Sequence, residues 1–429
     1  MLAAFAETDT SFAFRLLSIV GIGVFILLAW LMSVDRKGVA WKTVAWGVAL
    51  QFIFAVVVLH PSLQSYFFDA VNGAVTKLLS FAEEAAVFVF GSFADDGKVH
   101  PSFLNIACWI IIPTIIFFSS LMSLLYQLGI MQRIVYAIAW VMKRTMKTTG
   151  PESLSAAANI FVGQTEAPLV IKPYVHKMHL SELHAIMTGG FATVAGGVLA
   201  LYVGYLSMGI PDIAGHLVAA SIMSAPAALA VSKIMFPMPK DHIVEDDELT
   251  LMVEKPYDNV IEAAASGASE GVKLVVNVLA MLIAFIGLIA MLNWGIGLIS
   301  ISGEPLTLQQ ILGWIFSPIA FVMGVPWVEC GMVGQLLGEK LILTELVAYS
   351  HLGEMAKDPE IVMSQRSAII CSYALCGFAN FASIGIQIGG IGGIAPDRIK
   401  DLSKIGLRAM IGGSLAAFMT ATIAGALIG

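Results

Sequence analysis

Long stretches without a charged residue alternate with short charged segments along this chain. These stretches cover residues 16–34, 43–59, 101–132, 185–211, 217–232, 274–303, 367–396 and 409–429. A helix of about 20 apolar residues spans the hydrocarbon core of a bilayer. The pattern therefore predicts an all-α membrane protein with eight transmembrane helices.

A further apolar segment, residues 151–174, does not fit a simple spanning helix. It is interrupted by polar residues and prolines such as Asn159, Glu166 and Pro168, and basic residues flank it on both sides, at Lys147 and Lys177. Basic loops mark the cytoplasmic side of a membrane. The segment is therefore predicted to enter and leave on that same side, as a re-entrant helical hairpin.

A second such segment, residues 306–352, is broken at 324–326 and carries Glu329, Glu339, Lys340 and Glu345 in its second arm. Counting the spans places both of its ends outside, which predicts a second re-entrant hairpin. An interrupted helix at membrane depth leaves backbone N–H and C=O groups unpaired, which is tolerated only where protein or a polar cavity supplies their hydrogen-bond partners. Paired interruptions in two halves of a transporter indicate its binding site.

A short repeated sequence motif indicates that the chain has two related halves. The sequence GFAT at 190–193 follows the first predicted hairpin, and GFAN at 377–380 follows the second. Since each motif lies in the span after its hairpin, we predict an internal repeat of the inverted type.

Composition restricts the function. Hydrophobic residues make up 58% of the chain and charged residues 12%, so a polar surface in water is excluded. The net charge of −7 without a basic cluster gives no support to nucleic-acid binding. No phosphate-binding G-x-x-x-x-G-K-[ST] sequence is present, which removes support for an ATP-driven pump. We interpret the chain as a solute carrier rather than an enzyme.

The basic residues also predict the orientation. They lie after the first span, after the third span and before the last span, whereas the chain starts with acidic residues at Glu7 and Asp9. The predicted N-terminus is therefore outside and the basic loops are cytoplasmic. The short N-terminal segment favours a bacterial inner membrane.

Ionisable groups at membrane depth are costly and usually functional. Glu166 and Glu345 lie in the two predicted hairpins, and either lines a polar site or pairs with a lysine, as Glu345 would with Lys340. Neutral polar residues accompany them. These are Asn159, Gln164 and Thr165 in the first hairpin, and Thr193, Asn380 and Ser383 in the spans that follow the hairpins. Asn380 and Ser383 share a helix face. Oxygen atoms of Asn and Thr side chains, with carbonyls freed at a helix break, would suit Na⁺.

Three motifs resemble the concentrative nucleoside transporters. The first is VGQTEAPL at 162–169 followed by IKPY at 171–174, the second is GEKLILTELVAY at 338–349, and the third is GFANFASI at 377–384. The family usually has Asn-Glu-Phe where this chain has Thr344, Glu345 and Leu346. This departure keeps the glutamate and leaves the role of Thr344 undefined.

The resemblance implies an elevator-type homotrimer that binds nucleosides of the uridine type. It implies base recognition by Gln164, Thr165 and Glu166, with Leu169 and Val198 packed on the base. It implies ribose binding by Glu345, Asn380 and Ser383, with Phe378 nearby. It also implies a Na⁺ site formed by the side chains of Asn159 and Thr193 and the carbonyls of Val162 and Val194.

The same resemblance divides the chain into regions. Residues 1–127 would hold scaffold helices 1–3, with an interfacial helix near 62–92. Hairpin 1 would cover 151–178, helices 4–5 would cover 181–234, and helix 6 would cover 267–303. Hairpin 2 would cover 306–352 and helices 7–8 would cover 363–429.

Sodium is the expected coupling ion, because the chain keeps the sequence TEAP at 165–168 that resembles the sodium-coupled branch. A proton-coupled nucleoside symporter is the alternative within transport. An intramembrane hydrolase is the alternative from another class, and its only candidate groups are Ser383 and His184. Purine or pyrimidine preference and ion stoichiometry stay open at this point.

Overall fold

The computed structural model describes residues 12–59, 61–90, 111–207, 209–210, 212–239, 257–301, 304–356, 358, 361 and 363–428. The first half contains α1 (Phe12–Leu31), α2 (Trp41–Leu59), α3 (Pro61–Phe90), α5 (Ile112–Gln127), α6 (Ile130–Met146), α7 (Gly150–Ala158), η3 (Ala167–Ile171), α8 (Lys172–Val175), α9 (Leu180–Ala192), α10 (Gly196–Leu206) and α11 (Ile213–Met235). The second half contains α12 (Val260–Ile296), β1 (Ser300–Ile301), β2 (Glu304–Pro305), α13 (Leu308–Val322), α14 (Cys330–Ile342), α15 (Glu345–Met355), α16 (Gln365–Leu375), α17 (Phe381–Ile394), η4 (Pro396–Arg398) and α18 (Ile399–Leu427).

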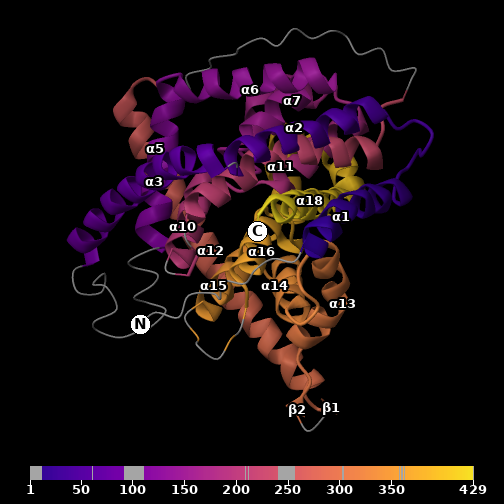
Figure 1. Cartoon of the computed structure of the whole chain (residues 1–429). Coiled ribbons are helices and arrows are strands. Elements are labelled where there is room, and N and C mark those ends of the chain that lie inside the picture. The colour runs from indigo at the N-terminus through magenta and orange to yellow at the C-terminus, as the bar shows by residue number, and fades with distance from the viewer. Residues whose placement is uncertain are drawn as a thin grey trace.

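The protein is built almost wholly from helices, as predicted. Five helices or helix pairs in the described residues are long and apolar enough to cross a membrane, or six if α5 and α6 count as one bent span. The two strands are two residues long and pair at the far end of α12, which projects from the body of the molecule (Figure 1).

The order of elements repeats from α5 onward. A helix (α5 or α12) and a second helix (α6 or α13) are followed by a short helix (α7 or α14) and a break. A further short segment, a broken helix pair (α9–α10 or α16–α17) and a long buried helix (α11 or α18) complete each half. This order is what the predicted repeat requires.

The centre of the molecule is formed by the last helix of each half. α11 and α18 pack against each other, α11 also packs on α2 and α9, and α18 packs on α1 and α9. Most of their side chains are buried, including small residues that allow close approach. The first short helix is tied to this centre because Glu152 of α7 forms a buried ion pair of 2.7 Å with Lys233 at the end of α11.

Two predicted spans are broken helices. The span predicted over 185–211 consists of α9 and α10, and the span predicted over 367–396 consists of α16 and α17. The sequence predicted a span at each place, but not the breaks at 193–195 and 376–380. At the second break, Gly377 adopts a φ of 133°, and a Cβ there would lie 2.7 Å from the Phe191 carbonyl oxygen. Glycine is required by both observations.

The third predicted span also ends differently. Its first ten residues, 101–110, lie outside the described residues, and α5 stops at Gln127 instead of reaching residue 132. Gly129 adopts a φ of 75°, and the chain turns by 78° into α6. The apolar run continues through a change of direction that charge counting alone does not detect.

The segment predicted as the second hairpin contains three helices. The expected break at 324–326 separates α13 from α14, and a second break at Leu343 and Thr344 separates α14 from α15. Glu345 is therefore the first residue of α15, not part of one long second arm as predicted. Neither glycine nor proline marks this second break, so the local sequence gave no sign of it.

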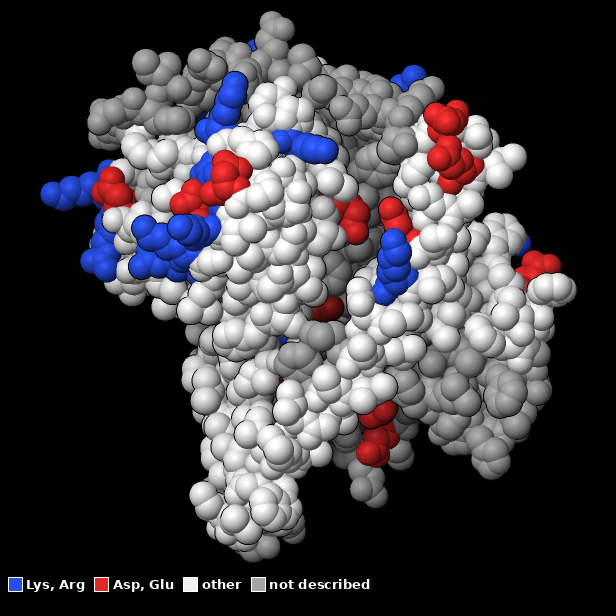
Figure 2. Space-filling view, turned by 180° about the vertical axis from the view of Figure 1, so that it is seen from behind, with Lys and Arg blue, Asp and Glu red and all other residues white. Residues whose placement is uncertain are grey.

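The surface differs between the two ends of the molecule. Figure 2 shows basic side chains gathered toward the upper end of that view, an uncharged projection at the lower end, and a hollow with acidic atoms between them. Large apolar side chains are exposed on α1, α2 and α12, for example Ile19, Ile53 and Ile283. Such exposure suits contact with lipid or with another protein surface.

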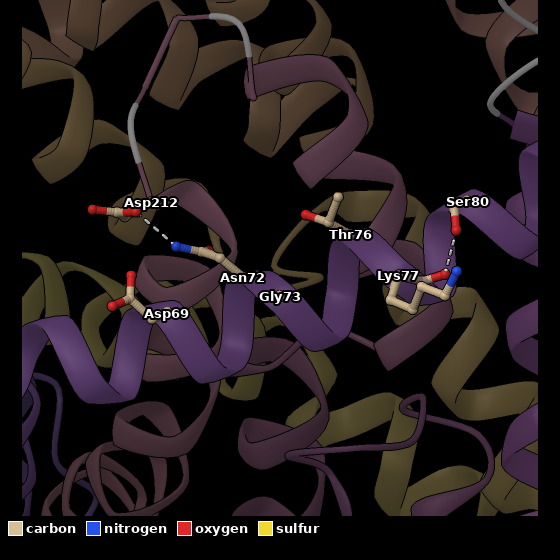
Figure 3. A pocket seen from close by; sticks show the side chains of 7 residues that line it. All are labelled: Asp69, Asn72, Gly73, Thr76, Lys77, Ser80 and Asp212. Atoms are coloured by element: carbon tan, nitrogen blue, oxygen red, sulfur yellow. Dashed lines mark hydrogen bonds between the residues drawn. The ribbon is translucent and has the colours of Figure 1, made fainter.

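An open pocket of about 490 Å³ lies between α3 and the start of α11. It is lined by Asp69, Asn72, Gly73, Thr76, Lys77, Ser80 and Asp212 (Figure 3). The Asn72 amide donates a hydrogen bond of 2.7 Å to Asp212, and its oxygen accepts one of 3.0 Å from the Gly215 N–H. None of the predicted site residues lines this pocket, so we interpret it as a contact between helices.

Candidate functional site

The breaks of the two helix pairs meet in space. The N–H of Phe378, in the break between α16 and α17, donates a hydrogen bond of 3.3 Å to the Thr193 carbonyl, at the end of α9. The first hairpin segment joins the same region because the Gly196 N–H donates to the Phe161 carbonyl at 3.0 Å. Polar backbone from three distant parts of the sequence is thus collected at one place.

The carboxylate of Glu345 lies in this region and is buried. It accepts a hydrogen bond of 2.8 Å from the Tyr202 hydroxyl on α10 and one of 2.9 Å from the Asn380 amide. Among the described residues no ion pair joins it to Lys340, whose ammonium donates to the Ala374 carbonyl at 2.9 Å. Glu345 therefore has neutral donors in place of the lysine pairing considered from the sequence.

Asn380 also caps the N-terminus of α17. Its side-chain oxygen accepts a hydrogen bond of 2.8 Å from the Ser383 N–H, which is a standard helix N-cap. This cap fixes the Asn380 side chain, so that its amide nitrogen points to Glu345. Ser383 in turn accepts a hydrogen bond of 3.1 Å from the Gln164 amide of the first hairpin segment.

A continuous polar network therefore joins the two halves of the repeat. It runs from Tyr202 through Glu345 and Asn380 to Ser383 and Gln164. Four of the predicted substrate-binding residues are members of it. Gln387 extends it, because its amide donates to the Gln164 oxygen at 3.0 Å.

Thr165, Glu166 and Leu169 follow Gln164 in the first hairpin segment. The Thr165 side chain lies at Gly390 of α17, where a Cβ would approach it to 2.6 Å. The carboxylate of Glu166 folds over Gly163, where a Cβ would be 2.2 Å away. Glu166 and Leu169 are exposed, and in the described part of the chain the network above does not include them.

The apolar candidates lie beside the network. Val198 is on α10, one turn before Tyr202, so both side chains share one helix face. Phe378 is partly buried and follows Gly377 directly in the break. These positions leave an apolar surface next to the polar groups, which is typical of small-molecule sites.

Two of the predicted sodium ligands, Thr193 and Asn159, both lie against Gly189. Thr193 donates its hydroxyl to the Gly189 carbonyl at 2.9 Å, and a Cβ at Gly189 would lie 3.4 Å from the Asn159 amide nitrogen. The Asn159 oxygen is buried and has no hydrogen-bond partner among the described residues. An unpaired buried oxygen beside a helix break fits a hard cation. Val162 and Val194 lie in the same two breaks and would supply carbonyl oxygens.

Comparison with known proteins places this arrangement in a family. The family profile described as Na⁺ dependent nucleoside transporter, C-terminus, matches residues 216–425, and its N-terminal counterpart matches 20–93. A profile described as nucleoside recognition matches residues 108–209. An uncharacterized transporter of Haemophilus influenzae is 45% identical over 96% of this chain and 97% of its own length. The chain belongs to the concentrative nucleoside transporter family.

Two further proteins are similar to this chain over nearly its whole length. The sodium/nucleoside cotransporter 1 of Mus musculus is 40% identical over 96% of this nucleoside transporter chain, which spans 64% of the mouse protein's length. The solved structure of CNTnw in an inward-facing, substrate-bound state superposes with a TM-score of 0.88 at 40% identity, covering 96% of this chain and 98% of that one.

Two residues of the transporter's network were not predicted from the sequence. Tyr202 follows Val198 by four residues, and Gln387 follows Ser383 by four residues, so each shares a face with a predicted residue. Gln387 is the one polar residue in an otherwise apolar stretch from Ile384 to Ile388. That isolated polar position is the signal that would have found it.

The hydrolase alternative has no geometric support in this transporter. His184 lies 2.7 Å from the hydroxyl of Ser232 on α11, whereas Ser383 bonds to Gln164 in another cluster. A nucleophile and its base must lie within hydrogen-bond reach of each other. Ser383 and His184 do not form such a pair.

Proposed function

We propose that this chain is a sodium-driven symporter that takes up nucleosides of the uridine type across a bacterial inner membrane. The observation that carries this proposal is the buried network that joins Gln164, Glu345, Asn380 and Ser383 from both halves of the repeat. Transporters typically bind substrate where two structural repeats meet, so a site assembled from both halves supports a transport function.

The residue types match the parts of a nucleoside. Vicinal ribose hydroxyls are donors and acceptors that suit the carboxylate of Glu345 and the side chains of Asn380 and Ser383. The base edge carries donors and acceptors that suit Gln164, Thr165 and Glu166. Leu169, Val198 and Phe378 supply the apolar surface on which the base and sugar rest.

Sodium is the proposed coupling ion, bound by the side-chain oxygens of Asn159 and Thr193 and the carbonyls of Val162 and Val194. The unpaired Asn159 oxygen supports this assignment. Because the ion ligands and the Gln164 turn belong to the same break region, ion binding would order the turn that contacts the base. Such shared ordering couples the two binding events.

The mechanism and assembly extend the same proposal. Residues 151–178 and 306–352 contain the re-entrant hairpins, the latter with its tip at Leu343 and Thr344. CNTnw has been solved in outward-facing, inward-facing and intermediate states. An elevator movement of the hairpins with α9–α11 and α14–α18 would interconvert such states here, on a scaffold that holds a homotrimer.

Uptake by purified protein in sealed vesicles tests the function. Vesicles are loaded without sodium, and labelled uridine is added with Na⁺ or with choline outside. We expect uridine to accumulate unaltered above its external concentration only with a sodium gradient. Accumulation driven equally by a proton gradient in sodium-free buffer would contradict sodium coupling, and equilibration without accumulation would contradict symport.

A further inference from the structure

Gln387 is a fully buried glutamine on α17 whose amide nitrogen has two acceptors. It donates to the Gln164 side-chain oxygen at 3.0 Å and to the Met187 carbonyl of α9 at 3.2 Å. A carboxamide nitrogen carries two hydrogens. Both donors of Gln387 are therefore used, and its own oxygen has no partner among the described residues.

These contacts fix the orientation of the Gln387 amide. If the amide rotated by half a turn, its oxygen would face the Met187 carbonyl, and two acceptors would oppose each other without a proton between them. The backbone carbonyl cannot change its role, so only one orientation of Gln387 makes both hydrogen bonds.

The orientation of Gln164 follows from that of Gln387. The Gln164 oxygen receives the Gln387 hydrogen, and the Gln164 nitrogen donates to the Ser383 hydroxyl at 3.1 Å. A rotated Gln164 would place its nitrogen against the nitrogen of Gln387, so that two donors would meet. The chain of bonds therefore has one direction, from Gln387 through Gln164 to Ser383.

A glycine on α9 leaves the space in which Gln164 and Gln387 meet. At Gly190 of α9, an added Cβ would lie 2.9 Å from both the Gln164 Cβ and the Gln387 amide nitrogen. Real Cβ contacts do not reach such distances, so the two glutamines pack against bare backbone. The first hairpin segment, α9 and α17 therefore meet closely at this glycine.

We propose that Gln387 is a positioning residue that holds the Gln164 amide in one orientation and thereby sets the nucleobase preference of the site. This inference rests on the proposed function. An amide that is free to rotate can match either donor–acceptor order on a base edge, whereas a fixed amide matches one order better. Uracil and cytosine have nearly the same shape and opposite donor–acceptor order at ring positions 3 and 4, so they distinguish the two situations.

The test measures the ratio of uridine to cytidine affinity in wild type and in Gln387→Met, which keeps the side-chain length and removes the amide. Binding is measured by calorimetry on purified protein in sodium, so that the readout does not depend on transport rate. We expect the ratio to change by about 5-fold or more, the effect of one hydrogen bond on a binding constant. If Gln387 had only a structural role, its loss would weaken the binding of both nucleosides equally and leave the affinity ratio unchanged.

Two further variants complete the test. Gln387→Asn keeps an amide that is one methylene too short to reach both acceptors, and it should also shift the ratio. Gln51→Met is the matched control, because Gln51 is a buried glutamine of α2 that bonds to the Gly47 carbonyl at 3.0 Å away from the network. Its ratio should equal that of wild type.

The outcomes separate this inference from the proposed function. If wild type binds both nucleosides and the two Gln387 variants show the same uridine-to-cytidine affinity ratio as wild type, the positioning role alone is overturned. Wild type that binds neither nucleoside in sodium would overturn the proposed function, and the inference with it.

Discussion

Glu345 combines a buried carboxylate with two neutral donors, the Tyr202 hydroxyl and the Asn380 amide. A buried carboxylate is costly unless hydrogen bonds or an ion pair compensate its charge. Two of its acceptor sites are filled by protein, and a ribose hydroxyl would fill another with a charge-assisted bond about twice as strong as a neutral one. The residue is therefore equipped for a ligand that brings hydroxyl donors.

Glu345→Gln should weaken nucleoside binding by about 2 kcal/mol, or about 30-fold. The substituted amide can still donate to the Tyr202 oxygen and accept from Asn380, so folding should persist. Calorimetry with uridine and with 2′,3′-dideoxyuridine gives a double cycle that isolates the sugar contact. The variant should discriminate less between these two ligands than wild type does.

A buried acid elsewhere in the same region provides the control for this cycle. Glu339 of α14 pairs with His351 at 2.8 Å and Gln335 at 3.1 Å, outside the network. Glu339→Gln should keep the wild-type preference for the intact ribose. If Glu345→Gln also keeps that preference in full, Glu345 is not the sugar ligand.

Thr193 is the proposed sodium ligand that is easiest to test on its own. Its hydroxyl donates to the Gly189 carbonyl and leaves its lone pairs available to a cation. Thr193→Val keeps the shape and removes the oxygen, so we expect the Na⁺ concentration for half-maximal uptake to rise about tenfold, the equivalent of about 1.4 kcal/mol. Thr188→Val on the same helix, whose hydroxyl faces His184 at 3.3 Å, should leave the sodium dependence unchanged. An identical sodium curve for both variants would refute the assignment of Thr193.

At the scale of elements, the polar groups of the two predicted hairpin segments were easier to single out from the sequence than the helix breaks around them. Charge at apolar depth singled out Glu166 and Glu345, and helical spacing paired Asn380 with Ser383. The breaks at Thr193 and at Thr344 could not be predicted locally, because distant groups stabilise them. The Thr193 carbonyl is satisfied by Phe378, and Glu345 is held by Tyr202 and Asn380.

Tyr202 and Gln387 were missed for a related reason. A buried tyrosine or glutamine in an apolar helix gains its role from the groups that other helices bring to it. Tyr202 meets Glu345 across 143 residues of sequence, and Gln387 meets Gln164 across 223. The sequence pattern reports the face of the helix on which each lies, but not what it faces.

The contribution of the contact between α3 and α11 to local stability can be measured. Asp212, at the N-cap position of α11, provides no cap of its own, and Asn72 of α3 caps the Gly215 N–H instead. Asn72→Ala should therefore cost about 1–2 kcal/mol of local stability. Hydrogen exchange should show lost protection at the first turn of α11, with residues far from α3 unaffected.

Ser80→Ala is the control on the same helix. Its hydroxyl donates to the Lys77 carbonyl of the same helix at 2.8 Å, so exchange in α11 should not respond. Equal protection of the α11 first turn in wild type and in Asn72→Ala would show that Asn72 is not its cap.

At the scale of the whole molecule, loops that the sequence assigns to the cytoplasm lie together. Val34 after α1 bonds to Met235 at the end of α11, at 3.0 Å. Thr43 at the start of α2 bonds to the Met146 carbonyl at the end of α6, at 2.9 Å. Arg398 before α18 donates to the carbonyls of residues 175, 176 and 178 after the first hairpin segment. Segments separated in sequence thus form one basic end of the molecule.

This clustering makes the membrane orientation testable with single cysteines. Lys147 and Lys177 are exposed and flank the first hairpin segment, whereas Glu354 is exposed near the end of α15. With basic loops retained in the cytoplasm, cysteines replacing Lys147 and Lys177 should react with an impermeant reagent only from the cytoplasmic side, and one replacing Glu354 only from outside. Cys330, Cys371 and Cys376 are buried and should give little background, and Cys108 is replaced by serine. Labelling of the two lysine positions from opposite faces would mean that the segment crosses the membrane. Labelling of all three positions from one face would instead place the two hairpins on the same side, which an inverted repeat does not allow.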